Sequence, residues 1–229
     1  MKPYGRETKQ KVGDILMETE REPAFEKLAL IPDEQLVGHL FSYFYNKNEL
    51  IKFRSVTAMG LLGARTAKRN MEKARIILRR IMWNLNDESG GIGWGSPEAM
   101  GEILSQSPEL ALEFKPILFS YLDPDGNYIE HEMLQRGVLW GIGTYLDAHP
   151  QDLNEKTRAM LYCYLHSDDP IKRAYAVRAL TNAKNFQCGL VPDHIIADNS
   201  FVDLFNCWNF TAIRISDLIS GCEDKRFLI

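Results

Sequence analysis

Apolar residues recur at helical spacing along most of this chain. The stretch 168–180, DDPIKRAYAVRAL, shows the pattern most clearly, with an aspartate suited to a helix N-cap and a proline suited to the first turn. Small apolar side chains then occupy one face of the predicted helix. Such a thin face is typical of helices that pack closely on other helices. We therefore predict a helical protein with close contacts between helix faces.

The same periodicity predicts helices in pairs. Leading helices are expected over 71–84, 108–121 and 153–166, and following helices over 49–67, around AMG at 99–101, at RGVLWGIGTYL from 136, and over 168–180. The N-terminal part predicts helices over 6–20, 24–30 and 33–44. Prolines and asparagines separate these segments.

Small residues recur in register from one pair to the next. The string AMG at 58–60 returns at 99–101, an interval of 41 residues, and Arg136 and Arg173 are 37 residues apart. These intervals lie near the roughly 40–47 residues of two-helix repeats. An irregular helical bundle, in which glycines only mark close helix crossings, remains the alternative.

The Asp-Pro, the basic residues after it and the alanine-rich stripe of 168–180 resemble the second helix of a HEAT repeat. The resemblance is closest to HEAT-like repeats of the phycobilisome lyase type. It implies an all-α, right-handed α-solenoid of about four to five HEAT-like helix pairs. Residues 1–190 would form this solenoid with N-terminal capping helices, and residues 191–229 a C-terminal extension that caps the stack.

The pattern changes after residue 185. The segment FVDLFNCWNFTAIRIS, 201–216, alternates between apolar and polar residues, with a turn expected over 206–209. A small β-hairpin that covers the exposed end of the stack is one interpretation, and a shortened helix pair is the other. Residues 223–229 are expected to form a poorly ordered tail.

Composition narrows the class of protein. The chain has 229 residues, of which 45% are apolar and 25% charged, and a formal net charge of −4. This acidic balance argues against nucleic acid as the partner. We expect four free thiols, mostly buried, in a reducing cytoplasm, because the cysteines show no C-x-x-C spacing. No apolar run reaches the length of a membrane span, and the N-terminal stretch is too polar for an exported leader.

Two carboxylates stand out in the repeat alignment. Glu98 and Glu102 occupy positions where the other repeats carry mainly small or apolar residues, and they share one helix face. Trp94 precedes this helix, and His131 and Glu132 open the next repeat. One hypothesis is a divalent metal held by Glu98, Glu102, His131 and Glu132, and another is a cationic group stacked on Trp94. Alternatively, the carboxylates only favour the helix N-terminus and pair with a cation across the groove.

Arg54, Arg136 and Arg173 share one repeat position and should line up along one surface. Such a row could grip an acidic protein or a nucleic-acid backbone. Alternatively, each guanidinium binds acidic or carbonyl groups of the adjacent repeat.

These features favour a protein-binding scaffold whose concave groove carries an acidic and aromatic patch. No resident cofactor is expected apart from the metal of the hypothesis above. An enzyme, or a small-ligand or metal-binding protein with its site at the glycine-rich loop, is the alternative. Helical-repeat DNA glycosylases are similar in architecture alone, and the acidic charge argues against that activity. The sequence leaves catalysis undecided.

Overall fold

The computed structural model describes residues 4–86, 92–184, 186 and 191–219. Most of this part of the chain is helical, and a two-stranded antiparallel hairpin lies near its C-terminal end. The predicted mostly helical fold and the small hairpin are therefore confirmed. The elements are α1 (Tyr4–Leu16), α2 (Arg21–Ala29), α3 (Asp33–Tyr43), α4 (Glu49–Arg69), α5 (Met71–Leu85), α6 (Ser96–Gln106), α7 (Pro108–Ser120), α8 (Glu132–Ala148), the 3₁₀ turn η1 (Pro150–Asp152), α9 (Glu155–Tyr164), α10 (Pro170–Thr181), α11 (Asp193–Ile196), β1 (Phe201–Asn206) and β2 (Asn209–Arg214).

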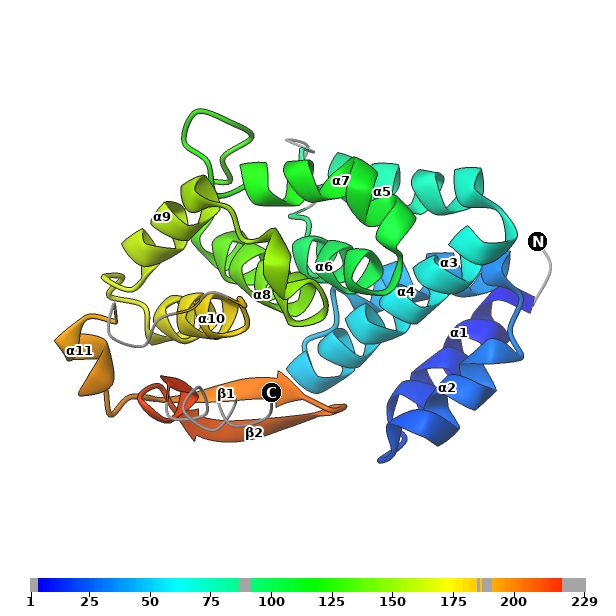
Figure 1. Cartoon of the computed structure of the whole chain (residues 1–229). Coiled ribbons are helices and arrows are strands. Elements are labelled where there is room, and N and C mark those ends of the chain that lie inside the picture. Colours follow the sequence, from blue (N-terminus) through cyan, green and yellow to red (C-terminus); the bar gives the residue numbers. More distant parts are fainter. Residues whose placement is uncertain (1–3, 87–91, 185, 187–190, 220–229) are drawn as a thin grey trace.

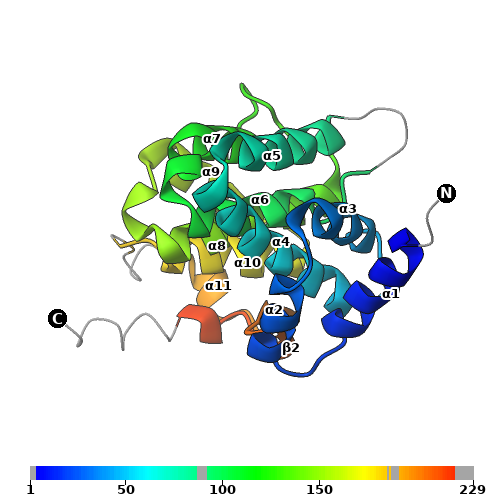
Figure 2. The ribbon, with the colours of Figure 1, turned by 90° about the vertical axis from the view of Figure 1, so that its right-hand side faces the viewer.

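The helices form two layers, with further segments below them (Figure 1). Helices α4, α6, α8 and α10 lie side by side as an inner layer, and α5, α7 and α9 cover one side of it. Figure 2 shows α2 and the hairpin on the opposite side of the inner layer, which we call the inner face. The inner helices therefore pack against their neighbours in the row and against the outer helices, and α4 and α10 also contact the hairpin.

Polar side chains begin many of these helices where the sequence predicts boundaries. A capping side chain accepts a hydrogen bond from a backbone N–H of the first turn at Asn48, Asn70, Asn154 and Asp169. Such caps satisfy donors that have no partner within the helix. Local signals therefore mark the starts of α4, α5, α9 and α10.

Glycines allow the inner helices to approach one another closely. A Cβ atom at Gly101 in α6 would lie 2.3 Å from the backbone oxygen of Gly141 in α8. A Cβ at Gly60 in α4 would lie 2.7 Å from the Cβ of Glu102 in α6. In α8, Gly143 faces the Cα of Ala179 in α10. The predicted small residues therefore lie where neighbouring inner helices meet.

The hairpin turns where the sequence predicts, but it lies in a different place. Strand pairing brings Asn206 opposite Asn209, with Cys207 and Trp208 as the turn. We expected the hairpin to cover the end of the stack. Instead, it runs along the inner face, and its tip reaches α2 and α4 (Figures 1 and 2). That prediction was wrong because the inner face carries large aromatic rings, which the hairpin covers.

The hairpin turn is strained, and burial of Trp208 offsets the strain. Cys207 and Trp208 have φ angles of 46° and 80°, in the left-handed region. This conformation costs about 1–2 kcal/mol for each non-glycine residue. A buried tryptophan removes about 150–250 Å² from water, worth about 4–6 kcal/mol at about 25 cal/mol per Å². Only 1% of Trp208 is exposed, so its burial outweighs the strain.

Several other expectations can be compared with the structure. Cys163 and Cys207 are free thiols, but both are exposed, so the expectation of burial was wrong for these two. Cys188, Cys222, the predicted tail over 223–229 and the proposed domain boundary at residue 190 lie outside the described residues, as does part of the glycine-rich loop. Among the helices that the structure describes, none is long and apolar enough to cross a membrane.

Candidate functional site

The inner face is largely filled by aromatic side chains. Phe53 of α4 and Trp140 of α8 meet with ring centroids 5.3 Å apart. Phe205 and Phe210 of the hairpin each pack 5.2 Å from Phe53. The open concave groove that we expected is therefore closed here by the chain's own C-terminal segment. Any recognition on this side must use the space that the hairpin leaves.

One such space is a pocket of about 500 Å³ beside the hairpin tip. We call it the hairpin-tip pocket. Its walls come from α2, from all four inner helices and from the hairpin. The lining residues are Arg21, Phe25, Thr57, Glu102, Ser105, Gln106, Trp140, Thr144, Asp147, Ala148, Arg178, Phe205, Asn206, Cys207 and Trp208. This volume lies within the range of about 300–1,000 Å³ that is typical of ligand pockets.

Glu102 places a carboxyl group in the wall of the hairpin-tip pocket. Only 9% of the residue is exposed. Thr57 Oγ1 donates to Oε1 over 3.0 Å, and Gln106 Nε2 donates to Oε2 over 3.4 Å. Burial raises the pKa of Glu102 above its ordinary value, while the Thr57 hydrogen bond and the charge of Arg178 oppose that shift. Neutral donors, rather than the expected ion pair, therefore hold this carboxyl.

Arg178 brings a positive charge to the same pocket from α10. Its Nη1 donates to the backbone oxygen of Trp140 over 3.1 Å, and its Nη2 donates to Thr144 Oγ1 over 3.2 Å. The guanidinium carbon lies 5.3 Å from the centroid of the Trp140 ring. Burial lowers the pKa of Arg178, opposed mainly by the charges of Asp147 and Glu102. The pocket thus contains acidic and basic groups that bind neutral partners.

Glu98 lies one turn earlier on α6, outside the lining of the hairpin-tip pocket. It is 5% exposed, and its Oε2 has no hydrogen-bond partner. Burial raises the pKa of Glu98, and the charge of Lys52 acts in the opposite direction. The same carboxyl contributes to the raised pKa of the buried Tyr175 in α10. The two carboxylates that the sequence pairs therefore occupy different surroundings.

The structure does not assemble the proposed metal site. The His131 ring packs edge-to-face on Trp94, with centroids 5.5 Å apart. Glu132 forms an ion pair with the buried Lys172 of α10. Glu102 is held by neutral donors, as described above. Throughout the part of the chain that the structure describes, no three His, Cys, Asp or Glu side chains cluster in a way that could hold a metal ion.

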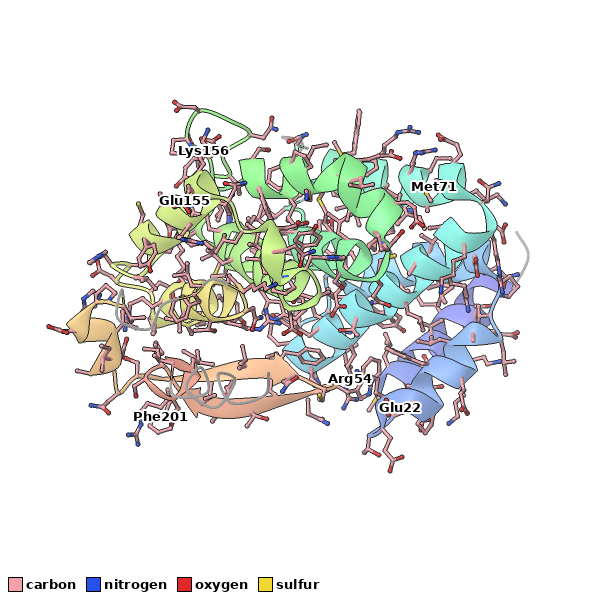
Figure 3. The ribbon with its side chains drawn as sticks, in the orientation of Figure 1. Glu22, Arg54, Met71, Glu155, Lys156 and Phe201 are labelled. Atoms are coloured by element: carbon pink, nitrogen blue, oxygen red, sulfur yellow. The ribbon has the colours of Figure 1, made fainter. Side chains whose placement is uncertain are left out.

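The three repeat-position arginines bind groups of the protein itself. Arg54 donates to the backbone oxygens of Trp208 and Leu16, each over 2.9 Å. Figure 3 shows Arg54 between the hairpin and α2. Arg136 binds the carboxylate of Asp169, with a 2.6 Å separation. Arg173 binds Asp198 over 2.8 Å and also donates to backbone oxygens of the loop before α10. These guanidinium groups fasten segments together instead of forming the free basic row that we considered.

Of the charged and aromatic residues that line the pocket, Glu102 was expected from the sequence, whereas Arg178 and Trp208 were not. Lys172, Tyr175 and Arg178 recur every three residues in α10, a spacing that signals a polar stripe on one helix face. This polar stripe could have been predicted from the sequence. Trp208 gave a weaker signal, because a large apolar residue within a predicted turn needs a partner for its ring. Its contacts with Phe25 and with the backbone oxygen of Glu18 join segments about 190 residues apart in the chain.

No family model matches the chain. A protein of Archaeoglobus fulgidus, described as an uncharacterized protein, is 32% identical over 130 residues, which cover 55% of this chain and 64% of that protein. The chain thus matches less than two thirds of the length of this relative.

Three solved structures are similar in part. A designed armadillo repeat protein in complex with the peptide (KR)4 has 15% identity and a TM-score of 0.48, covering 93% of this chain and 97% of its own. A designed armadillo repeat protein for modular peptide recognition has 14% identity and a TM-score of 0.45, covering 93% and 98%. An engineered protein has 15% identity and a TM-score of 0.43, covering 76% and 78%. The architecture described above therefore rests on the chain's own helix contacts.

Proposed function

We propose that this chain is a protein-binding module and that the hairpin-tip pocket receives a short segment of the partner protein. The observation that carries the proposal is the pocket itself. The hairpin covers the neighbouring rings of the inner face, yet leaves about 500 Å³ between its tip and the four inner helices. A pocket with aromatic walls and a few ionisable groups is typical of a binding site.

The composition of the wall supports recognition of a polypeptide. Phe25, Phe205 and Trp208 supply apolar surface, which favours an apolar side chain of the partner. Gln106 and Thr144 supply neutral hydrogen-bonding groups that suit backbone amides. Rigid aromatic anchors beside polar groups are typical of interface hot spots.

The proposal includes the finer assignments that the sequence suggests. Residues 1–190 would be a HEAT-like solenoid with N-terminal capping helices, and residues 191–229 a C-terminal extension, whose hairpin lies along the inner face and not over the end of the stack. The module would act in the cytoplasm. The likeness to repeats of the phycobilisome lyase type contributes only to this architecture, because a shared fold does not carry an activity.

A peptide array tests the proposal. The purified chain is applied to arrayed random peptides in two formats, one with a free C-terminal carboxylate and one with a C-terminal amide. Peptides that bind are then measured in solution by fluorescence anisotropy. We expect a set of related peptides with dissociation constants in the micromolar range, about −8 kcal/mol.

A variant that fills the pocket provides the specificity test. Ser105 lies in the pocket wall and is only partly buried, so Ser105→Trp should block the pocket without removing a core side chain. Glu109→Trp places the same ring on exposed α7 and serves as the control. Loss of peptide binding in Ser105→Trp alone supports the proposal. Peptides that bind both variants equally, or a complete lack of peptide binding in both formats, would refute it.

A further inference from the structure

Arg178 enters the hairpin-tip pocket with spare hydrogen-bonding capacity. An arginine guanidinium has five N–H donors, and the structure shows two hydrogen bonds, to Trp140 and Thr144. Both acceptors are neutral. No carboxylate of the described residues lies within ion-pairing distance of this guanidinium, whereas Arg54 and Arg173 are held by several groups of the chain.

The surrounding helices hold this guanidinium in place. It crosses α8 over Gly143, where a Cβ atom would lie only 2.8 Å from Nη1. It also stacks over the Trp140 ring, and its two hydrogen bonds fix the plane. A side chain that is already ordered loses little conformational entropy when a ligand binds. Gly143 and Trp140 thus orient the remaining donors of Arg178 before any ligand arrives.

The charge of Arg178 calls for an anionic ligand. Arginine keeps its proton in proteins, so Arg178 stays positive in the pocket. Glu102 and Asp147 are the carboxyl groups in the pocket lining, and neither forms an ion pair with Arg178. The oxygens of Glu102 are held by Thr57 and Gln106, and burial raises the pKa of this carboxyl, so it repels an incoming anion less than an exposed glutamate would. A carboxylate is the anion that matches a planar guanidinium fork.

The rest of the pocket selects the source of that carboxylate. Phe25, Phe205 and Trp208 line the same pocket as Arg178, and Phe25 is the least buried of the three rings. At the C-terminus of a polypeptide, the carboxylate and the last side chain branch from the same carbon atom, so a single residue can contact both surfaces. An internal acidic residue would instead bring polar backbone from both directions toward those rings. Recognition of a C-terminal carboxylate is a known mode of peptide binding.

We propose that the hairpin-tip pocket binds the C-terminus of a partner protein, with the terminal carboxylate on Arg178 and an apolar last side chain against Phe25, Phe205 and Trp208. This inference rests on the proposed function. It adds the chemical identity of the recognised group and assigns Arg178 as the residue that determines specificity.

The test compares two forms of the same peptide. Each peptide selected on the array is synthesised with a free carboxylate and with a C-terminal amide, and its affinity is measured by fluorescence anisotropy. Hydrogen bonds to charged groups predict that amidation weakens binding about 10- to 100-fold. In Arg178→Gln, the free carboxylate should lose this advantage, so that both forms bind equally. Arg79→Gln, on exposed α5, should behave as the unchanged protein.

A second variant keeps the test valid if Arg178→Gln does not fold. Arg178→Lys retains the charge and most of the stem but lacks the planar fork, so it should reduce the carboxylate advantage without abolishing it. If a free peptide and its amide bind the unchanged protein equally, and Ser105→Trp blocks both, the carboxylate assignment is wrong. The proposed function would still stand. Selected peptides whose affinity depends on an internal Asp or Glu and survives amidation would also overturn it. A lack of any pocket-dependent peptide would refute the proposed function itself.

Discussion

Gly101 offers the sharpest test of how the inner helices pack. Gly101→Ala adds a single Cβ atom, which would lie 2.3 Å from the backbone oxygen of Gly141, whereas ordinary contact begins at 3.4 Å. Helices α6 and α8 must therefore separate by about 1 Å, because the obstacle is backbone and has no alternative rotamer. Overpacking of this kind costs about 1–3 kcal/mol, and the backbone clash places Gly101→Ala near the upper end.

The higher helix propensity of alanine partly offsets this loss of stability, and a control variant measures it separately. Alanine is favoured over glycine in a helix interior by about 1 kcal/mol, which leaves Gly101→Ala less stable by about 2 kcal/mol. Gly38 lies in α3, and a Cβ there would meet nothing within 4 Å. Gly38→Ala should therefore raise stability by about 1 kcal/mol, from the propensity term alone.

Urea unfolding and thermal unfolding, each followed by circular dichroism, measure both variants. For a chain of this size, 1 kcal/mol corresponds to about 2–4 °C in Tm, so Gly101→Ala should melt about 4–8 °C lower and Gly38→Ala slightly higher than the unchanged protein. If Gly101→Ala matches Gly38→Ala, helices α6 and α8 do not meet at this glycine and the repeat register is wrong.

Three further predictions concern the hairpin and the buried charges. Trp208→Ala should lower the free energy of unfolding by about 3–5 kcal/mol and speed amide exchange in the hairpin, whereas Phe201→Ala, at a site that is 63% exposed, should change stability by no more than about 0.5 kcal/mol. Arg54→Gln should lower the free energy of unfolding, measured in urea, by about 1.5–3 kcal/mol, because buried hydrogen bonds from a charged donor are lost. The control is Arg69→Gln, at a side chain that is 68% exposed. Burial raises the pKa of Glu98 in the folded state, so the native protein binds the extra proton and stability must fall as pH rises from the ordinary glutamate pKa through the raised one. Glu98→Gln should remove that fall, measured by urea unfolding at a series of pH values above the ordinary glutamate pKa; an unchanged pH profile would contradict the assignment.

The groups around Glu98 bear on that last prediction. Lys52 and Glu49 of α4 contribute charges of opposite effect, and Glu98 in turn helps to raise the pKa of Tyr175 in α10. Lys52 forms an ion pair with Glu49, so the positive charge of Lys52 acts on both Glu49 and Glu98. The pH profile of Glu98→Gln should therefore be compared with that of Glu49→Gln, which removes a negative charge that raises the pKa of Glu98.

The helical architecture could be predicted because its signals are local and repeated. Caps such as Asn70 and Asp169 mark helix starts within a few residues. Gly60 and Gly101 recur at one position of the repeat, and a contact between neighbouring repeats needs the same small residue each time. Each signal depends only on residues that are close in the sequence or one repeat away.

The placement of the hairpin could not be predicted in that way. Arg54 binds Trp208, which follows it by 154 residues, and no local pattern records such a contact. The buried carboxyl at Glu102 was anticipated from the alignment, but its neutral partners Thr57 and Gln106 depend on how α4 and α6 pack. The metal hypothesis failed for a similar reason, because Glu132 turns to Lys172 of the following repeat.

The hairpin tip is both a wall of the pocket and a segment that must stay docked, so ligand binding and docking are linked. A peptide that contacts Trp208 and Arg178 together binds only while the tip lies on α2 and α4. At a free peptide concentration of about 100 times Kd, the bound form is stabilised by about 2.7 kcal/mol. If the hairpin amides exchange by detachment of the tip, their exchange should slow about 100-fold on saturation, while those of α5, on the outer layer, should change far less. Equal protection of both segments would mean that the peptide stabilises the whole fold, and no protection of the hairpin would show that its tip is not part of the binding site.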